Sequence, residues 1–325
     1  MCPMETPILE VKNLVLAFEI DEKNYEAIKD ISLNFFPGKI HAIVGESGCG
    51  KTMSAMSIIK LLPNNAKILN GEVIFHDDNI LEFCEKELRK IRGKKIALIP
   101  QDPMTSLNPL YTIENQLLET ILEHRDVDKE EAYEIAVKTL KDVEISDPEK
   151  RMKAYPHELS GGMKQRVIIA MALATKAEVI IADEPTTALD VTIQAQILKL
   201  LKEIRDLGKT VILITHDLGT VSSYADEVSV MYLGKIIEQS PVRELFRNPK
   251  HPYTKALINA LPSDKSKVLQ NIKGQPSPIT EQVSGCPFHP RCPYVMEVCK
   301  SVMPDLNFVN GTKVACWLFD KPENK

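Results

Sequence analysis

The chain lacks several features that mark whole classes of protein. In 325 residues no apolar run approaches the ~20 residues needed to cross a bilayer, and no secretory signal opens the sequence. The net charge is -5 and the pI about 5.9, so a broad basic surface for nucleic acid is not expected. We therefore expect a cytosolic protein with no nucleic-acid partner, which meets a membrane only through another protein.

A glycine-rich loop follows the apolar segment 40–44 and reads GESGCGKT from Gly45 to Thr52. Backbone N–H groups in such a loop can wrap a phosphate chain, because glycine has no side chain to block close approach. Lys51 adds a positive charge for the β- and γ-phosphates, and Thr52 offers a hydroxyl to Mg²⁺ at the start of a helix. The predicted nucleotide contacts are Gly45, Ser47, Gly48, Cys49, Gly50, Lys51, Thr52 and Met53, with Cys49 contributing only its N–H.

A second apolar run, 179–182, ends in Asp183 and Glu184. One interpretation is a buried strand whose polar tip meets solvent. Downstream of a phosphate loop, Asp183 is better interpreted as the acid that holds Mg²⁺ through water, and Glu184 as the base that orients the attacking water. The two patterns together predict hydrolysis of a nucleotide.

Four further motifs, in the order found in the ATP-binding-cassette (ABC) family, accompany this pair. Leu159–Met163 (LSGGM) resembles the family's signature, although the family usually has glutamine in the fifth place. Gln101 resembles the Q-loop glutamine, Ala188-Leu189-Asp190 the D-loop, and His216 the switch histidine. The resemblance implies an ATPase with Lys51, Gln101, Glu184 and His216 in catalysis, Mg²⁺ near Thr52, Gln101 and Asp183, and Asp190 at the nucleotide site.

The resemblance also implies a dimer. In the family, Ser160, Gly161 and Gly162 stand at a helix N-terminus, which is a ready anion site. They face away from their own nucleotide and complete the ATP site of a second, identical or related, ATPase subunit. ATP would therefore close a head-to-tail dimer and hydrolysis would release it.

The predicted fold class is α/β, an ABC ATPase with a RecA-like parallel sheet. Segments 40–44, 96–100, 179–183, 210–215 and 227–232 are apolar and alternate with helical stretches, which predicts a parallel sheet covered on both faces. Residues 8–38 predict short antiparallel side strands with a turn near 21–24. Phe18 is the first candidate to stack on adenine and Tyr25 the second; either could be an ordinary strand residue. We expect a nucleotide-binding domain over 1–250, with a helical lobe near 102–165, and a small extension over 251–325.

The sequences of four segments narrow the resemblance to importers of dipeptides and oligopeptides. The prolines in QDPMTSLNP, 101–109, predict a shaped loop rather than a continuing helix. His251–Thr254, Gly274–Pro276 and the segment GCPFHPRC at 285–292 resemble the C-terminal extension of peptide-importer ATPases.

Four of the seven cysteines lie in this extension, at Cys286, Cys292, Cys299 and Cys316. Without an export signal we expect reduced thiols rather than disulfides. Four thiolates in a segment poor in apolar residues suggest a metal centre, either Zn²⁺ or an iron–sulfur cluster. The spacing lacks the close Cys-x2-Cys pairs that are typical of zinc ribbons, which makes zinc the less favoured metal. The resemblance favours a [4Fe-4S] cluster, and free thiols remain a third possibility.

The function implied is an ATPase subunit on the cytoplasmic face of the cell membrane. It would pair with a second ATPase beneath two permease subunits fed by an extracytoplasmic peptide-binding protein. Nickel and oligosaccharide importers use similar subunits. A soluble cassette ATPase acting on ribosomes or DNA is the alternative from another class, but such proteins carry two cassettes or long insertions, whereas this chain has one cassette and trailing cysteines.

Overall fold

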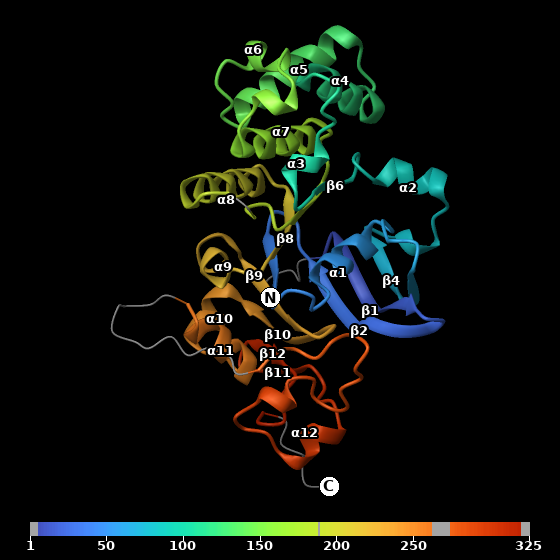
Figure 1. Ribbon diagram of the computed structural model, residues 1–325, viewed down its shortest axis with the longest axis vertical. Coiled ribbons are helices and arrows are strands. Elements are labelled where there is room, and N and C mark those ends of the chain that lie inside the picture. The colour runs from blue at the N-terminus through green and yellow to red at the C-terminus, as the bar shows by residue number, and fades with distance from the viewer. Residues whose placement is uncertain (1–5, 188, 262–273, 320–325) are drawn as a thin grey trace. The chain divides into compact units, whose positions relative to one another are not determined.

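The computed structural model describes residues 6–187, 189–261 and 274–319. These form two compact units (Figure 1). Of the described residues, the first unit contains 6–36, 40–81, 215–261 and 274–319, and the second contains 37–39, 82–187 and 189–214. The boundary expected near residue 250 stays a prediction; the described part of the C-terminal segment lies in the same unit as the phosphate loop.

The side sheet of the first unit is antiparallel, as predicted, in the order β2-β1-β4-β5. Its strands are longer than expected, because Asp21 and Glu22 adopt positive φ angles of 49° and 62° and close a tight hairpin. That turn fixes the register that pairs Phe18 with Tyr25. The strands are β1 (Leu9–Ile20), β2 (Lys23–Phe35), β4 (Ala66–Phe75) and β5 (Asp78–Asn79).

The first unit has a second sheet, in which β3 (Ile40–Val44) is buried throughout and runs parallel to β9 (Glu227–Tyr232). Beyond β9 the order continues through β10 and β12 to β11 with antiparallel pairing. The remaining elements of this unit are β10 (Lys235–Pro241), β11 (Asn307–Val309), β12 (Thr312–Val314), α1 (Lys51–Ile58), α9 (Leu218–Tyr224), α10 (Val242–Arg247), α11 (Pro252–Asn259), η3 (His289–Arg291) and α12 (Glu297–Ser301).

One hydrophobic core joins the C-terminal segment to the strand that leads into the phosphate loop. Val44 and Tyr232 belong to the same buried cluster as Tyr253 and Phe288. Strand β12 extends the sheet by pairing Val314 with Glu238 of β10. The C-terminal segment is therefore packed into the unit that carries the loop.

In the second unit three parallel strands have the order β8-β7-β6. They are β6 (Ile96–Ile99), β7 (Val179–Asp183) and β8 (Thr210–Thr215, whose last residue is assigned to the first unit), and nearly every residue in them is buried, which explains their continuous apolar sequences. The helices α2 (Glu85–Ile91) and α8 (Val191–Asp206) belong to this unit, and η1 (Ile80–Glu82) spans the boundary.

The helical lobe is present, and its helices α4 to α7 gather together in Figure 1. Asp128 caps α5 by accepting a hydrogen bond from the N–H of Glu131 at 2.9 Å. The loop after Gln101 contains one helical turn, because Pro103 stands at its first position, where proline is tolerated. The lobe consists of α3 (Pro103–Ser106), α4 (Ile113–His124), α5 (Lys129–Asp142), α6 (Pro148–Met152), η2 (Pro156–Glu158) and α7 (Gly161–Ala174).

Among the described residues, no helix is both long and apolar enough to cross a bilayer.

Candidate functional site

The phosphate loop connects β3 to α1, the strand–loop–helix context that its sequence requires. A Cβ atom on Gly45 would lie only 2.2 Å from the carbonyl oxygen of Met231, so no other residue fits there. Gly48 and Gly50 have φ angles of 76° and 106°, which side chains rarely adopt. The backbone path of the loop therefore requires glycine at 45 and favours it at 48 and 50.

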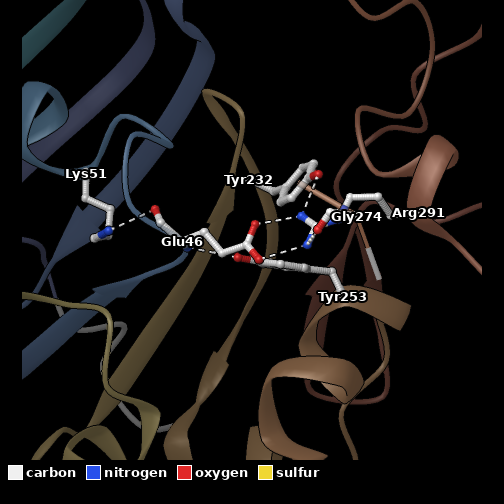
Figure 2. Close-up of polar contacts among 6 residues, drawn as sticks. All are labelled: Glu46, Lys51, Tyr232, Tyr253, Gly274 and Arg291. Atoms are coloured by element: carbon white, nitrogen blue, oxygen red, sulfur yellow. Dashed lines mark hydrogen bonds and ion pairs between the residues drawn. The ribbon is translucent and has the colours of Figure 1, made fainter. Parts of the chain in front are cut away.

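The Lys51 side chain crosses this loop and is 4% exposed. Its Nζ donates hydrogen bonds to the carbonyl oxygen of Gly45 at 3.0 Å and to that of Glu46 at 3.1 Å; Figure 2 draws the second of these. The ammonium is thereby held inside the loop, within the arc where phosphate oxygens would be bound. Burial raises the pKa of the Cys49 thiol, which fits a residue that serves the loop through its backbone.

A cavity of about 470 Å³ opens beside the loop. Phe18 lines it, whereas Tyr25, its cross-strand partner, is not among the lining residues. This placement favours Phe18 as the aromatic beside a base, and that role stays a prediction. The full lining is Phe18, Glu46, Ser47, Gly48, Cys49, Tyr232, Leu233, Pro276, Ser277, Pro278 and Ile279.

In the second unit, Asp183 and Glu184 lie at the carboxyl end of β7, where parallel sheets bind ligands. Asp183 is buried, and Glu184 adopts a positive φ of 44° with its N–H donating to the carbonyl oxygen of Ile214 at 2.9 Å. The Glu184 carboxylate accepts from Nε2 of Gln101 at 3.2 Å and from the hydroxyl of Thr187 at 3.1 Å. The structure thus brings together two residues, Gln101 and Glu184, that lie 83 positions apart.

The signature residues stand at the start of α7. Ser160 is its N-cap and accepts a hydrogen bond from the N–H of Met163 at 3.3 Å, and Gly161 and Gly162 form the first turn. A Cβ atom on Gly162 would lie 2.8 Å from Ile193 Cγ2 of α8, so glycine permits close packing of the two helices. The predicted helix N-terminus at the signature is present; its role toward ATP stays a prediction.

Asp190 and His216 are the remaining predicted residues. Asp190 caps α8 by accepting from the N–H of Ile193 at 3.0 Å; Ala188 lies outside the described residues. His216 is exposed directly after β8, and Asp217 caps α9 through a 2.8 Å hydrogen bond from the N–H of Gly219.

The four C-terminal cysteines line one small cavity, of about 20 Å³. Burial raises the pKa of Cys286 to about 12 and that of Cys316 to about 11, and burial also raises the pKa of Cys292. Over residues 6–187, 189–261 and 274–319, no group of three or more His, Cys, Asp or Glu is arranged to hold a metal ion. The expected metal centre therefore has no support in the ligand geometry, although the donors gather in one place.

Sequence reasoning missed the part that the C-terminal segment takes at the loop. Arg291 and Tyr253 contact Glu46, the second residue of the loop. Arg291 lies inside the GCPFHPRC segment singled out by resemblance, but its partner is 245 positions away. No local pattern identifies such a pair.

Both the N-terminal and the C-terminal parts of the chain match known protein families. Residues 28–187 match the ABC transporter family, and residues 237–299 match the C-terminal region of oligopeptide/dipeptide transporters. The dipeptide transport ATP-binding protein DppD of Bacillus subtilis is 45% identical and aligns over 97% of this chain and 95% of its own length. The oligopeptide transport ATP-binding protein OppD of Escherichia coli is 44% identical over 95% of this chain and 93% of its own. A dimeric ATP-binding cassette solved with ADP and phosphate is 31% identical, with a TM-score of 0.65 over 72% of this chain and 99% of the other.

Proposed function

This chain belongs to the ABC transporter family of ATP-binding proteins, and we propose that it is the ATP-hydrolysing subunit that powers import of dipeptides or oligopeptides. The observation that carries the proposal is the phosphate loop, whose glycines and buried Lys51 have the geometry of a nucleotide site. The match of residues 237–299 to the C-terminal region of peptide transporters supports the cargo class. That region and the likeness to DppD and OppD favour peptides over nickel or oligosaccharides, and transport over action on ribosomes or DNA.

ATP hydrolysis requires little covalent catalysis by the protein, because phosphoryl transfer is accelerated mainly by positioning of the reactants and neutralisation of charge. Lys51 and the loop N–H groups would hold the phosphates. Glu184 would orient the attacking water, with Gln101 hydrogen-bonded to its carboxylate. His216, the fourth predicted catalytic residue, would act beside the γ-phosphate.

Mg²⁺ is implied by this family, and the residue types fit it. The Thr52 hydroxyl, the Gln101 amide oxygen and the buried Asp183 carboxylate are oxygen donors of the kind that Mg²⁺ prefers. When bound, the ion would neutralise charge that develops on the β- and γ-phosphate oxygens.

We propose that two ATPase subunits associate head to tail, with Ser160, Gly161, Gly162 and Asp190 completing the partner's site. Ser160 is exposed at the start of a helix of 14 residues, whose N–H groups and dipole favour an anion. The structural relative solved with ADP and phosphate is itself a dimer.

The membrane partners would be two permease subunits on the cytoplasmic face, fed by an extracytoplasmic peptide-binding protein. The loop after Gln101 supports a docking role, because it exposes Met104 (59%), Leu110 (80%) and Tyr111 (51%). Large apolar side chains gathered on one surface segment indicate a surface that another protein covers.

The four-cysteine centre is kept as a separate hypothesis. Its support is that Cys286, Cys292, Cys299 and Cys316 line one cavity, and against it stands the absence of a metal-ligand group among the described residues. If a [4Fe-4S] cluster or, alternatively, zinc is present, these four thiols would hold it. Anaerobically purified protein should then be brown with absorbance near ~400 nm, whereas colourless protein without iron would rule out the cluster.

The central test is Glu184→Gln, which keeps the shape of the side chain and removes the base. With ATP this variant should form a stable dimer by size-exclusion chromatography, and hydrolysis should fall at least ~100-fold. Adding Ser160→Arg should abolish the dimer without unfolding the chain. If Glu184→Gln hydrolyses ATP near the normal rate, or a strictly monomeric Ser160→Arg protein does, the proposed mechanism is wrong.

The cargo class needs a separate readout. The subunit reconstituted with its permeases and binding protein should show ATP hydrolysis stimulated by peptides. Stimulation by nickel or an oligosaccharide instead would overturn the peptide assignment while leaving the ATPase intact.

A further inference from the structure

An ion pair joins the phosphate loop to the C-terminal segment. Arg291, at the end of η3, donates from Nη1 to Glu46 Oε2 at 2.7 Å and from Nη2 to Glu46 Oε1 at 3.0 Å (Figure 2). Two parallel charge-assisted bonds fix both the distance and the orientation of the carboxylate. The Arg291 side chain is 6% exposed and that of Glu46 25%. The pair is therefore shielded from solvent, unlike an ordinary surface ion pair.

From this geometry we propose that Arg291 is a positioning residue for the phosphate loop, which it holds through Glu46 so that the C-terminal segment is a functional part of the nucleotide site. The inference rests on the proposed ATPase function. Under this proposal, nucleotide binding requires Arg291 of the C-terminal segment in addition to the residues of the phosphate loop.

The guanidinium is rigidly held. Nη1 also donates to the hydroxyl of Tyr232 at 3.1 Å, and Nη2 to the carbonyl oxygen of Gly274 at 3.1 Å. Its carbon lies 5.8 Å from the ring centre of Tyr232 and 6.0 Å from that of Phe288. Both rings belong to the buried core, so packed aromatic side chains hold the guanidinium in place independently of its contact with the loop.

Glu46 is held at three points. Its carboxylate binds Arg291, its N–H donates to the hydroxyl of Tyr253 at 2.9 Å, and its carbonyl oxygen accepts from Lys51. Arg291 and Tyr253 belong to the C-terminal part of the unit, and Lys51 is the predicted phosphate ligand. One residue of the loop therefore connects the C-terminal segment to the lysine that would bind phosphate.

Charge gives the contact a consequence for binding. Glu46 places a carboxylate in a loop that must accept a polyanion, and repulsion between like charges a few ångströms apart is strong where water is partly excluded. Arg291 neutralises that carboxylate through two charge-assisted hydrogen bonds. Without the arginine, Glu46 would repel the phosphates.

The cavity beside the loop gives independent support. Pro276, Ser277, Pro278 and Ile279 line the same cavity as Phe18, Ser47 and Gly48. The C-terminal segment thus contacts the loop through Arg291 and also forms one wall of the space that the nucleotide base is expected to enter.

The test uses the full chain and titrates a non-hydrolysable ATP analogue by calorimetry. Arg291→Met should raise Kd about tenfold, on the order expected for an unneutralised, partly buried carboxylate near phosphates. Because salt screens repulsion, the loss should shrink as ionic strength rises from ~0.05 to ~0.5 M. Arg291→Lys, which keeps the charge and loses the bidentate contact, should lie within about threefold of the natural protein.

The double variant Arg291→Met with Glu46→Gln separates neutralisation from direct contact. Removing the carboxylate should restore Kd to within about threefold of the natural protein, since the repelling group is gone. The control is Lys300→Met, which breaks an exposed ion pair of the same 2.7 Å length with Glu297 elsewhere in the C-terminal segment. Its Kd should not change.

Three results would overturn the proposal. A folded Arg291→Met protein with unchanged Kd and only a lower Tm would make the ion pair purely structural. A double variant as weak as Arg291→Met would mean that Arg291 does not act through Glu46. If Arg291→Met does not fold, a folded double variant with a tenfold weaker Kd would count against it equally. Failure of the natural protein to bind the analogue would instead refute the proposed function.

Discussion

Replacing His251 by asparagine should make the protein less sensitive to acid. His251 is 1% exposed and caps α11, where its Nδ1 accepts a hydrogen bond from the N–H of Tyr253 at 3.0 Å. Burial lowers its pKa from 6.5 to about 3. Protonation of Nδ1 would set a proton against the Tyr253 N–H and place a charge at a helix N-terminus, which disfavours cations.

The sign and size follow from linkage between protonation and folding. Because the folded pKa lies below the unfolded one, the unfolded chain takes up the proton first, and stability falls as the pH drops below 6.5 toward about 3. A pH of about 5 lies ~1.5 units below the pKa of the imidazole in the unfolded chain. Protonation of the unfolded chain therefore lowers the free energy of unfolding by about 2 kcal/mol relative to pH 7. This figure requires only that the folded pKa stay well below 5.

The assay is urea unfolding at about pH 7 and pH 5, followed by circular dichroism. Asparagine is a good helix cap with no proton to gain, so His251→Asn keeps the acceptor for Tyr253 and removes the titration. The natural protein should lose about 2 kcal/mol more than the variant between the two pH values.

Other titrating groups act in both proteins and cancel in the comparison. Buried His41, whose pKa burial lowers to about 4, destabilises in the same direction, and His157→Asn removes an exposed histidine as a control. Equal losses for the natural protein and His251→Asn would refute the reasoning.

Two further predictions concern the phosphate loop. Lys51→Ala should abolish measurable ATP binding while the chain stays folded, because the Lys51 ammonium is the positive charge expected to bind the phosphates. An ATP affinity within threefold of that of the natural protein, measured by calorimetry, would contradict the assignment. Gly45→Ala should be destabilised by at least about 2 kcal/mol in urea unfolding, because its Cβ would lie 2.2 Å from the backbone oxygen of Met231; unchanged stability would show that the loop can yield.

Much of the fold could be predicted because its signals are local. The five buried strands are predominantly apolar segments, and β3, β7, β8 and β9 begin and end where the sequence predicts. The cap of α5 is likewise encoded within four residues, from Asp128 to Glu131. The length of β1 and β2 was underestimated, because polar residues on their outer face and the positive φ angles at Asp21 and Glu22 disguise one long hairpin.

The site divides in the same way. The sequence ranks Phe18 ahead of Tyr25 as the aromatic beside adenine but leaves both open, and the cavity favours Phe18 because Phe18 lines it and Tyr25 does not. The hydrogen bond between Gln101 and Glu184 depends on the pairing of β6 with β7. The cysteine spacing indicates that four thiols gather, and the structure gathers them, but spacing alone does not determine ligand geometry.

The phosphate loop can be recognised from eight consecutive residues, because its glycines and the place of Lys51 are local features. The contact that holds this loop from outside depends on long-range packing. Glu46 and Arg291 are 245 positions apart, and they meet because one hydrophobic core packs the C-terminal segment against the end of β3 and β9. Contacts of that kind depend on how distant segments fold together, and no stretch of sequence specifies them alone.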